Sequence, residues 1–182
     1  MKQLVLAALM CLAAMSAKAQ VLTSETVKNV HNELASKAKS DYVYNVDYTD
    51  NDITTMYVYK KDYADKDILL LKPYLKYDYT YASDGTLTNK VTYHWDSIKN
   101  CWTCATCHDY AVTTDGKYIV EYSRYNPDTD RFDQPSDRMV YSLIPYNGIN
   151  SVSSYHREDP MSQFQLVGEM QVMDMPVLYA LQ

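Results

Sequence analysis

Three cysteines and a histidine fall within one short segment of the chain, and their types and spacing could do chemistry. Cys104, Cys107 and His108 form the pattern C-x-x-C-H, which attaches c-type haem through two thioethers and ligates its iron through the imidazole. Together with Cys101 they supply the donors of a Cys₃His zinc site. A thiol beside a histidine would instead be a nucleophile with its base.

The backbone expected for this segment works against all three uses. Alternation over residues 102–112 predicts a strand, in which successive side chains point to opposite faces. Cys104 and His108 would share one face and Cys107 the other. The two cysteine Cα atoms would be about 10 Å apart at the usual strand rise, whereas a disulfide tolerates about 7 Å. We therefore predict no catalytic residue, no metal site and no cofactor. Covalent haem or redox chemistry through Cys104, Cys107 and His108 remains the alternative.

Aromatic side chains are the second candidate for a functional site. The chain has 19 Tyr against 2 Phe and 2 Trp, and tyrosine suits half-buried strands and binding surfaces. Such rings can stack on sugars and are enriched at protein interfaces. The other interpretation is that they only cover the sheet. The residues predicted to form a ligand or partner face are Tyr77, Tyr79, Tyr81, Trp95 and Trp102.

These residues belong to a repeated β-hairpin. Alternating strands flank Asp84-Gly85 and Asp115-Gly116, and Asp-Gly favours the positive φ angles of a tight hairpin turn. Each unit ends in two aromatic residues separated by six turn-like residues, a spacing that suits a cross-strand contact. The units span about residues 76–105 and 107–135. Residues 68–71 are wholly apolar and predict a buried strand.

One helix is expected before the strands. Thr23 can cap it, and Val27, Val30 and Leu34 recur at helical spacing. The sequence therefore predicts an N-terminal helix within residues 20–40 and a single β-rich domain over 41–182. The fold class is all-β, an antiparallel meander of repeated β-hairpins with one short N-terminal helix. On the strand after the first Asp-Gly, alternation predicts an inward face of Val91, Tyr93 and Trp95 and a polar face of Lys90, Thr92 and His94.

Residues 1–19 have the features of a cleavable signal peptide. Lys2 precedes an apolar run that is too short to span a membrane, and Ala17-Lys18-Ala19 fits a signal peptidase site. A lipoprotein signal ending at Cys11 is disfavoured because the large Met10 precedes it. The protein is expected to be exported to the periplasm or beyond, and to be soluble after cleavage with no transmembrane segment. Its net charge of −6 argues against binding nucleic acid.

The run from Lys72 to Tyr81, KPYLKYDYTY, followed by an Asp-Gly turn, resembles small secreted Bacteroidales proteins that are grouped as a domain of unknown function. The resemblance covers most of the chain after the leader, roughly residues 41–143. It implies a secreted, tyrosine-rich β protein with no assigned activity or catalytic residues. We expect a non-enzymatic binding or envelope-interaction module, whose partner is an envelope protein or a glycan.

Overall fold

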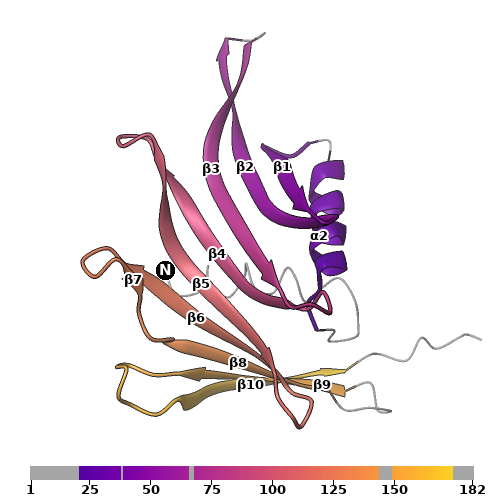
Figure 1. Ribbon diagram of the computed structural model, residues 1–182, viewed down its shortest axis with the longest axis vertical. Coiled ribbons are helices and arrows are strands. Elements are labelled where there is room, and N and C mark those ends of the chain that lie inside the picture. The colour runs from indigo at the N-terminus through magenta and orange to yellow at the C-terminus, as the bar shows by residue number, and fades with distance from the viewer. Residues whose placement is uncertain (1–20, 38, 66–67, 144–148, 174–182) are drawn as a thin grey trace, which may run out of the picture.

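The computed structural model describes residues 21–37, 39–65, 68–143 and 149–173, so the predicted leader, residues 1–19, lies outside them. One helix stands beside a strongly curved antiparallel sheet (Figure 1). The elements are α2 (Ser24–Ser36), β1 (Tyr42–Thr49), β2 (Asp52–Asp65), β3 (Ile68–Tyr81), β4 (Leu87–Asp96), β5 (Cys101–Val112), β6 (Tyr118–Asn126), β7 (Arg131–Phe132), β8 (Asp137–Leu143), β9 (Ile149–His156) and β10 (Gln165–Met173).

The sheet is a meander, as the sequence predicts. Its strand order is β1-β2-β3-β4-β5-β6-β8-β9-β10, and the short β7 pairs with β6. Gly85 and Gly116 adopt φ angles of 81° and 78° in the turns after β3 and β5. The aromatic pairs that close the turns after β4 and β6 are in contact, with ring centroids 5.0 Å apart for Trp95–Trp102 and 5.6 Å for Tyr125–Phe132. The all-β prediction is therefore confirmed.

Local hydrogen bonds define the start of α2 and tie it to the sheet. The Thr23 hydroxyl accepts from the Thr26 backbone N–H at 3.3 Å, and the Thr26 hydroxyl accepts from the Thr23 N–H at 3.3 Å, which forms a capping box. Just before the helix, the Leu22 carbonyl accepts from the Leu87 N–H at 2.8 Å, and the Ser24 N–H donates to the Gly85 carbonyl at 3.0 Å. Residues 22–24 are thus fastened to the turn between β3 and β4.

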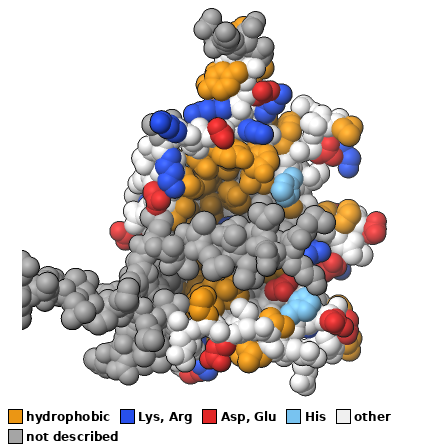
Figure 2. All heavy atoms as spheres, turned by 180° about the vertical axis from the view of Figure 1, so that it is seen from behind, with side chains coloured by type: hydrophobic (Ala, Val, Ile, Leu, Met, Phe, Trp, Pro, Cys, Tyr) orange, Lys and Arg blue, Asp and Glu red, His pale blue; other side chains and the backbone are white. Residues whose placement is uncertain are grey.

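The face of the sheet that packs against α2 is called the inner face here, and it carries the core. Val27 of the helix contacts Ile53 and Met56, which are 0% and 2% exposed. A second cluster on later strands contains Leu87, Tyr110, Tyr118 and Val120. In Figure 2 hydrophobic side chains gather over part of the surface and are bordered by charged ones. Within the described residues, no helix has the length and apolar character needed to cross a membrane.

Residues 68–71 correct one prediction. They form a strand, but Ile68, Leu69, Leu70 and Leu71 are all exposed rather than buried. The pairing of β2 with β1 ends at Lys60, and the pairing of β3 with β4 begins only at Leu75. The outer part of the β2–β3 hairpin therefore projects beyond both neighbouring strands (Figure 1), and nothing in the described chain covers it.

A β-bulge in β5 corrects a second prediction. Thr92 pairs with Thr106, but Tyr93 pairs with Cys104, so Ala105 is an extra residue without a partner. A bulge of this kind reverses the alternation of side chains along the strand. Cys104 and Cys107 therefore point to the same face, opposite to the inner face, instead of to different faces as expected. His108 points to the inner face.

Candidate functional site

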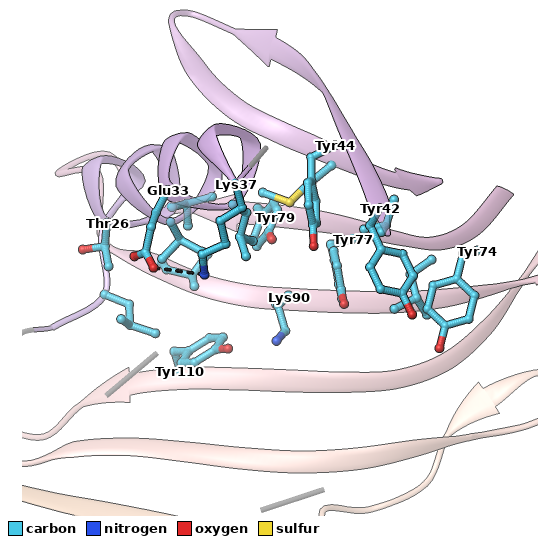
Figure 3. A pocket seen from close by; sticks show the side chains of 18 residues that line it. Thr26, Glu33, Lys37, Tyr42, Tyr44, Tyr74, Tyr77, Tyr79, Lys90 and Tyr110 are labelled. Atoms are coloured by element: carbon cyan, nitrogen blue, oxygen red, sulfur yellow. Dashed lines mark ion pairs between the residues drawn. The ribbon is translucent and has the colours of Figure 1, made fainter. Parts of the chain in front are cut away.

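A pocket of about 730 Å³ lies between α2 and the inner face of the sheet (Figure 3). It is bounded by the helix on one side and by β1 to β5 on the other. Most of its wall is aliphatic or aromatic. The lining residues are Leu22, Thr26, Val27, Val30, Glu33, Leu34, Lys37, Tyr42, Tyr44, Met56, Val58, Tyr74, Leu75, Tyr77, Tyr79, Leu87, Lys90 and Tyr110.

The periodicity of each element explains how these side chains reach the pocket. Val27, Val30 and Leu34 lie on one face of α2, since residues three and four apart in a helix are neighbours. Met56 and Val58 are two residues apart on β2 and point to the same side of the sheet. Both are almost fully buried. The helix stripe and the strand alternation thus provide two facing apolar walls.

Tyrosines form much of the sheet side of the pocket, which is its floor, and one end of the pocket. Tyr77 and Tyr79 project from β3, with ring centroids 6.4 Å apart. Tyr42 and Tyr74 stack at 5.4 Å. Burial raises the pKa of Tyr77 to about 12 and also raises the pKa of Tyr79. These phenols therefore stay protonated and can donate hydrogen bonds to a bound molecule, but they cannot act as bases near neutral pH.

Lys90 of β4 is the charged residue in the floor. It pairs with Tyr79 on one side and with His108 on the other, so its side chain is on the inner face. Its amine lies 5.6 Å from the centroid of the Tyr77 ring. Burial lowers the pKa of Lys90 to about 8. Among the described residues, no carboxylate forms an ion pair with this amine.

His108 lies beside Lys90, outside the pocket wall. It is 7% exposed, and its ring packs edge-on against Tyr122 at 5.3 Å. Burial, and then the charge of Lys90, lower the pKa of His108 to about 3. Its Nδ1 atom has no hydrogen-bond partner within the described chain. His108 is therefore neutral near pH 7 and adds no second positive charge beside Lys90.

The five residues predicted to form one aromatic face are divided between two faces. Tyr77 and Tyr79 line the pocket. Tyr81 packs against both core clusters, and its hydroxyl donates to the Ile53 carbonyl at 2.8 Å. Trp95 and Trp102 lie on the outer face, where Trp102 is 6.2 Å from Tyr57. The sheet therefore has an aromatic pocket on one side and a separate aromatic cluster on the other.

The geometry of the C-x-x-C-H segment does not fit covalent haem. The imidazole of His108 points to the inner face, and Cys104 and Cys107 point to the outer face, whereas the motif needs its thiols and its imidazole around one porphyrin. Cys101, Cys104 and Cys107 are free thiols, and burial raises the pKa of Cys107. The Cys107 sulfur accepts from Asn89 Nδ2 at 2.9 Å. In the part of the chain that is described, no group of three potential ligands could hold a metal ion.

Sequence reasoning missed Lys90 as a pocket residue. Alternation on β4 predicted an inward face of Val91, Tyr93 and Trp95, but Lys90 is on the inner face and Tyr93 packs against Lys76 on the outer face. The prediction failed because it assumed that the inner face is apolar throughout. Here α2 stands away from β4 and leaves a cavity, in which a polar side chain is tolerated. The sequence did signal part of the pocket through the apolar stripe of α2, which indicates that an apolar surface faces the helix.

Comparison with known proteins identifies the family. A family model described as "Family of unknown function (DUF3836)" matches residues 17–143. The chain belongs to this family. The resemblance to Bacteroidales proteins of unknown function is thereby confirmed, and the match includes every residue of the pocket wall. None of the curated proteins matches the chain.

Three solved structures match the chain, and the first of them shows the same fold. A protein of unknown function from Bacteroides fragilis is 22% identical, with a TM-score of 0.61 over 72% of this chain and 92% of its own. A DUF3836 protein from Bacteroides vulgatus is 20% identical, with a TM-score of 0.46 over 51% of this chain and 89% of its own. One from Parabacteroides distasonis is 19% identical, with a TM-score of 0.47 over 55% and 88%.

Proposed function

We propose that this DUF3836 protein is an exported, non-enzymatic binding protein that holds a small, mainly apolar ligand in the pocket beneath α2. The observation that carries the proposal is the 730 Å³ pocket with its aliphatic and tyrosine walls. Pockets for small molecules typically have about 300–1,000 Å³, apolar walls and a few polar groups that orient the ligand. The leader predicted over residues 1–19 supports export.

The chemistry of the wall favours binding over catalysis. Its ionisable groups are the tyrosines, Glu33, Lys37 and Lys90. The phenols of Tyr77 and Tyr79 are held protonated, and Glu33 forms an ion pair with Lys37 at 3.2 Å. These groups can orient a ligand through hydrogen bonds and charge, which is the role that we assign to them.

A pocket-filling variant tests the proposal. Leu34→Trp places a large ring in the cavity, and Ala35→Trp places the same ring on the exposed side of the same helix. A neutral naphthylamine dye that fluoresces in apolar surroundings should bind the wild-type protein and Ala35→Trp, but not Leu34→Trp. Thermal melts should show that both variants fold. No dye binding by the folded wild type, or equal binding by both variants, would contradict the proposal.

A second candidate is supported by the outer aromatic cluster of Tyr57, Tyr59, Trp95 and Trp102. Tyr57 contacts both Tyr59 and Trp102, with centroids 6.5 Å and 6.2 Å apart. Such a cluster could stack on a glycan or contact an envelope protein. The chain's 2 Trp residues both lie here, so tryptophan fluorescence reports on this surface. Titration with envelope glycans should change that emission, and the response should be absent in Trp102→Ala. Emission unchanged by every glycan would argue against glycan binding.

A further inference from the structure

We infer that the pocket selects amphipathic ligands with one anionic head group, a carboxylate, which the ammonium of Lys90 receives while the apolar body lies between α2 and the sheet. This inference rests on the proposed function of the pocket. Three features of the pocket support it: the position of Lys90, the balance of charge around it, and the character of the remaining wall.

Lys90 is placed to meet a ligand inside the pocket. Its cross-strand partners on the inner face are Tyr79 and His108, and Figure 3 shows it between Tyr77 and Tyr110 in the floor. The side chain remains partly accessible, and it lines the pocket. A buried ammonium group without a partner is costly. Its placement here is explained if a ligand supplies the missing negative charge.

Within the described part of the chain, the charges around the pocket leave Lys90 uncompensated. Glu33 on α2 is the acidic residue of the wall, and its Oε1 atom is paired with Lys37 at 3.2 Å. His108 on β5 is uncharged near neutral pH, since burial lowers its pKa to about 3. With a pKa of about 8, Lys90 itself remains mainly protonated at neutral pH. The wall therefore presents one net positive charge, which matches one negative charge on a ligand.

The rest of the wall specifies the other end of the ligand and the kind of anion. Val27, Val30, Met56 and Val58 provide apolar surface suited to a hydrocarbon body. The described residues of the wall include no arginine, the residue that usually recognises doubly charged phosphates through paired hydrogen bonds. A single lysine among tyrosine hydroxyls is better matched to a carboxylate, which carries one charge and accepts several hydrogen bonds. A fatty acid has this combination.

Three ligands of equal chain length test the inference: dodecanoate, dodecanol and dodecylammonium. Their affinities are measured with the wild-type protein near neutral pH by displacement of the neutral dye and by calorimetry. Because the ammonium of Lys90 adds a charge-assisted hydrogen bond, dodecanoate should bind at least about tenfold more tightly than dodecanol. Dodecylammonium should bind more weakly than dodecanol. These measurements need no variant, so they remain decisive even if a substitution at Lys90 prevents folding.

Two variants then assign the preference to a residue. Lys90→Met should bind dodecanoate and dodecanol within about threefold of each other. Lys99→Met removes a lysine outside the pocket wall, whose side chain is 71% exposed, and it should retain the preference. If none of the three ligands binds the folded wild type, the proposed function fails. If dodecanol binds as tightly as dodecanoate, or if Lys90→Met keeps the preference, only the carboxylate inference is overturned.

Discussion

Lys90→Met is expected to stabilise the ligand-free protein near neutral pH. Burial lowers the pKa of Lys90 from 10.5 to about 8, so the folded state disfavours the charged form. Each pKa unit corresponds to about 1.4 kcal/mol, which sets an upper limit of about 3.5 kcal/mol on this cost. Water in the pocket reduces the cost, and we expect Lys90→Met to increase the free energy of unfolding by about 2 kcal/mol. Methionine is unbranched and fills the same space without a charge.

The dependence of this stabilisation on pH distinguishes the removal of a buried charge from an improvement in packing. The native state loses the Lys90 proton near pH 8, whereas the unfolded state keeps it until about pH 10.5. Since stability rises with pH wherever the unfolded state binds more protons, the cost is complete below pH 8 and is progressively relieved above it. The advantage of Lys90→Met should therefore be largest at about pH 6.5 and should shrink by about pH 9.5.

Urea denaturation followed by tryptophan fluorescence measures both effects. Lys99→Met is the matched control, because the Lys99 side chain is 71% exposed, and it should change the free energy of unfolding by less than about 0.5 kcal/mol. Lower stability of Lys90→Met than of the wild type at about pH 6.5 would contradict the predicted cost of the buried ammonium. A difference between the two proteins that does not narrow by about pH 9.5 would contradict it as well.

Three further predictions follow from the described side chains. His108 has a pKa of about 3 in the fold, so wild-type stability should fall by about 3 kcal/mol between about pH 6.5 and pH 4 as the unfolded state takes up a proton. In acid urea titrations His108→Phe should lack this part of the loss, and parallel stability curves for the two proteins would contradict the prediction. Cys101 is exposed, whereas Cys107 is buried and has a raised pKa. Under native conditions a thiol reagent should therefore modify Cys101 first and Cys107 last, which peptide mass spectrometry can show. The reverse order would place Cys107 at the surface. Gly85→Ala and Gly116→Ala should each lower the free energy of unfolding by about 1–2 kcal/mol, because both glycines have positive φ angles. An alanine Cβ would meet no atom closer than 3.6 Å, so the cost should come from the backbone and not from a clash. Thermal melts measure this loss, and a cost at only one turn would show that backbone strain is not the cause.

Local signals in the sequence predicted the local structure correctly. Asp-Gly pairs predicted the turns at Gly85 and Gly116, and both glycines have the positive φ angles that this requires. Thr23 predicted the cap of the helix, and it forms a capping box with Thr26. The aromatic spacing predicted the contact of Trp95 with Trp102. Each of these features depends on residues close together in the chain, so the information needed was present in a short window.

Features that depend on distant residues were not predictable in this way. The bulge at Ala105 appears only in the pairing of β5 with β4, and no residue type near it marks the position. The exposure of residues 68–71 depends on where β1 and β4 end relative to the β2–β3 hairpin. Lys90 becomes a pocket residue because α2 lies over the early strands and not over β4. The residue type shows whether such a side chain is apolar or polar, but its burial depends on which elements pack over it.

The meander has a consequence for how the protein acquires its pocket during synthesis. All the lining residues fall between Leu22 and Tyr110, and each strand of this part pairs with its neighbours in sequence. Folds rich in such local pairings form quickly, and chains generally fold from the end that emerges first. A chain that crosses a membrane with its N-terminus leading would therefore deliver α2 and β1 to β5 before the other strands. The pocket would be assembled first, and β6 to β10 would later cover the edge that β5 leaves open.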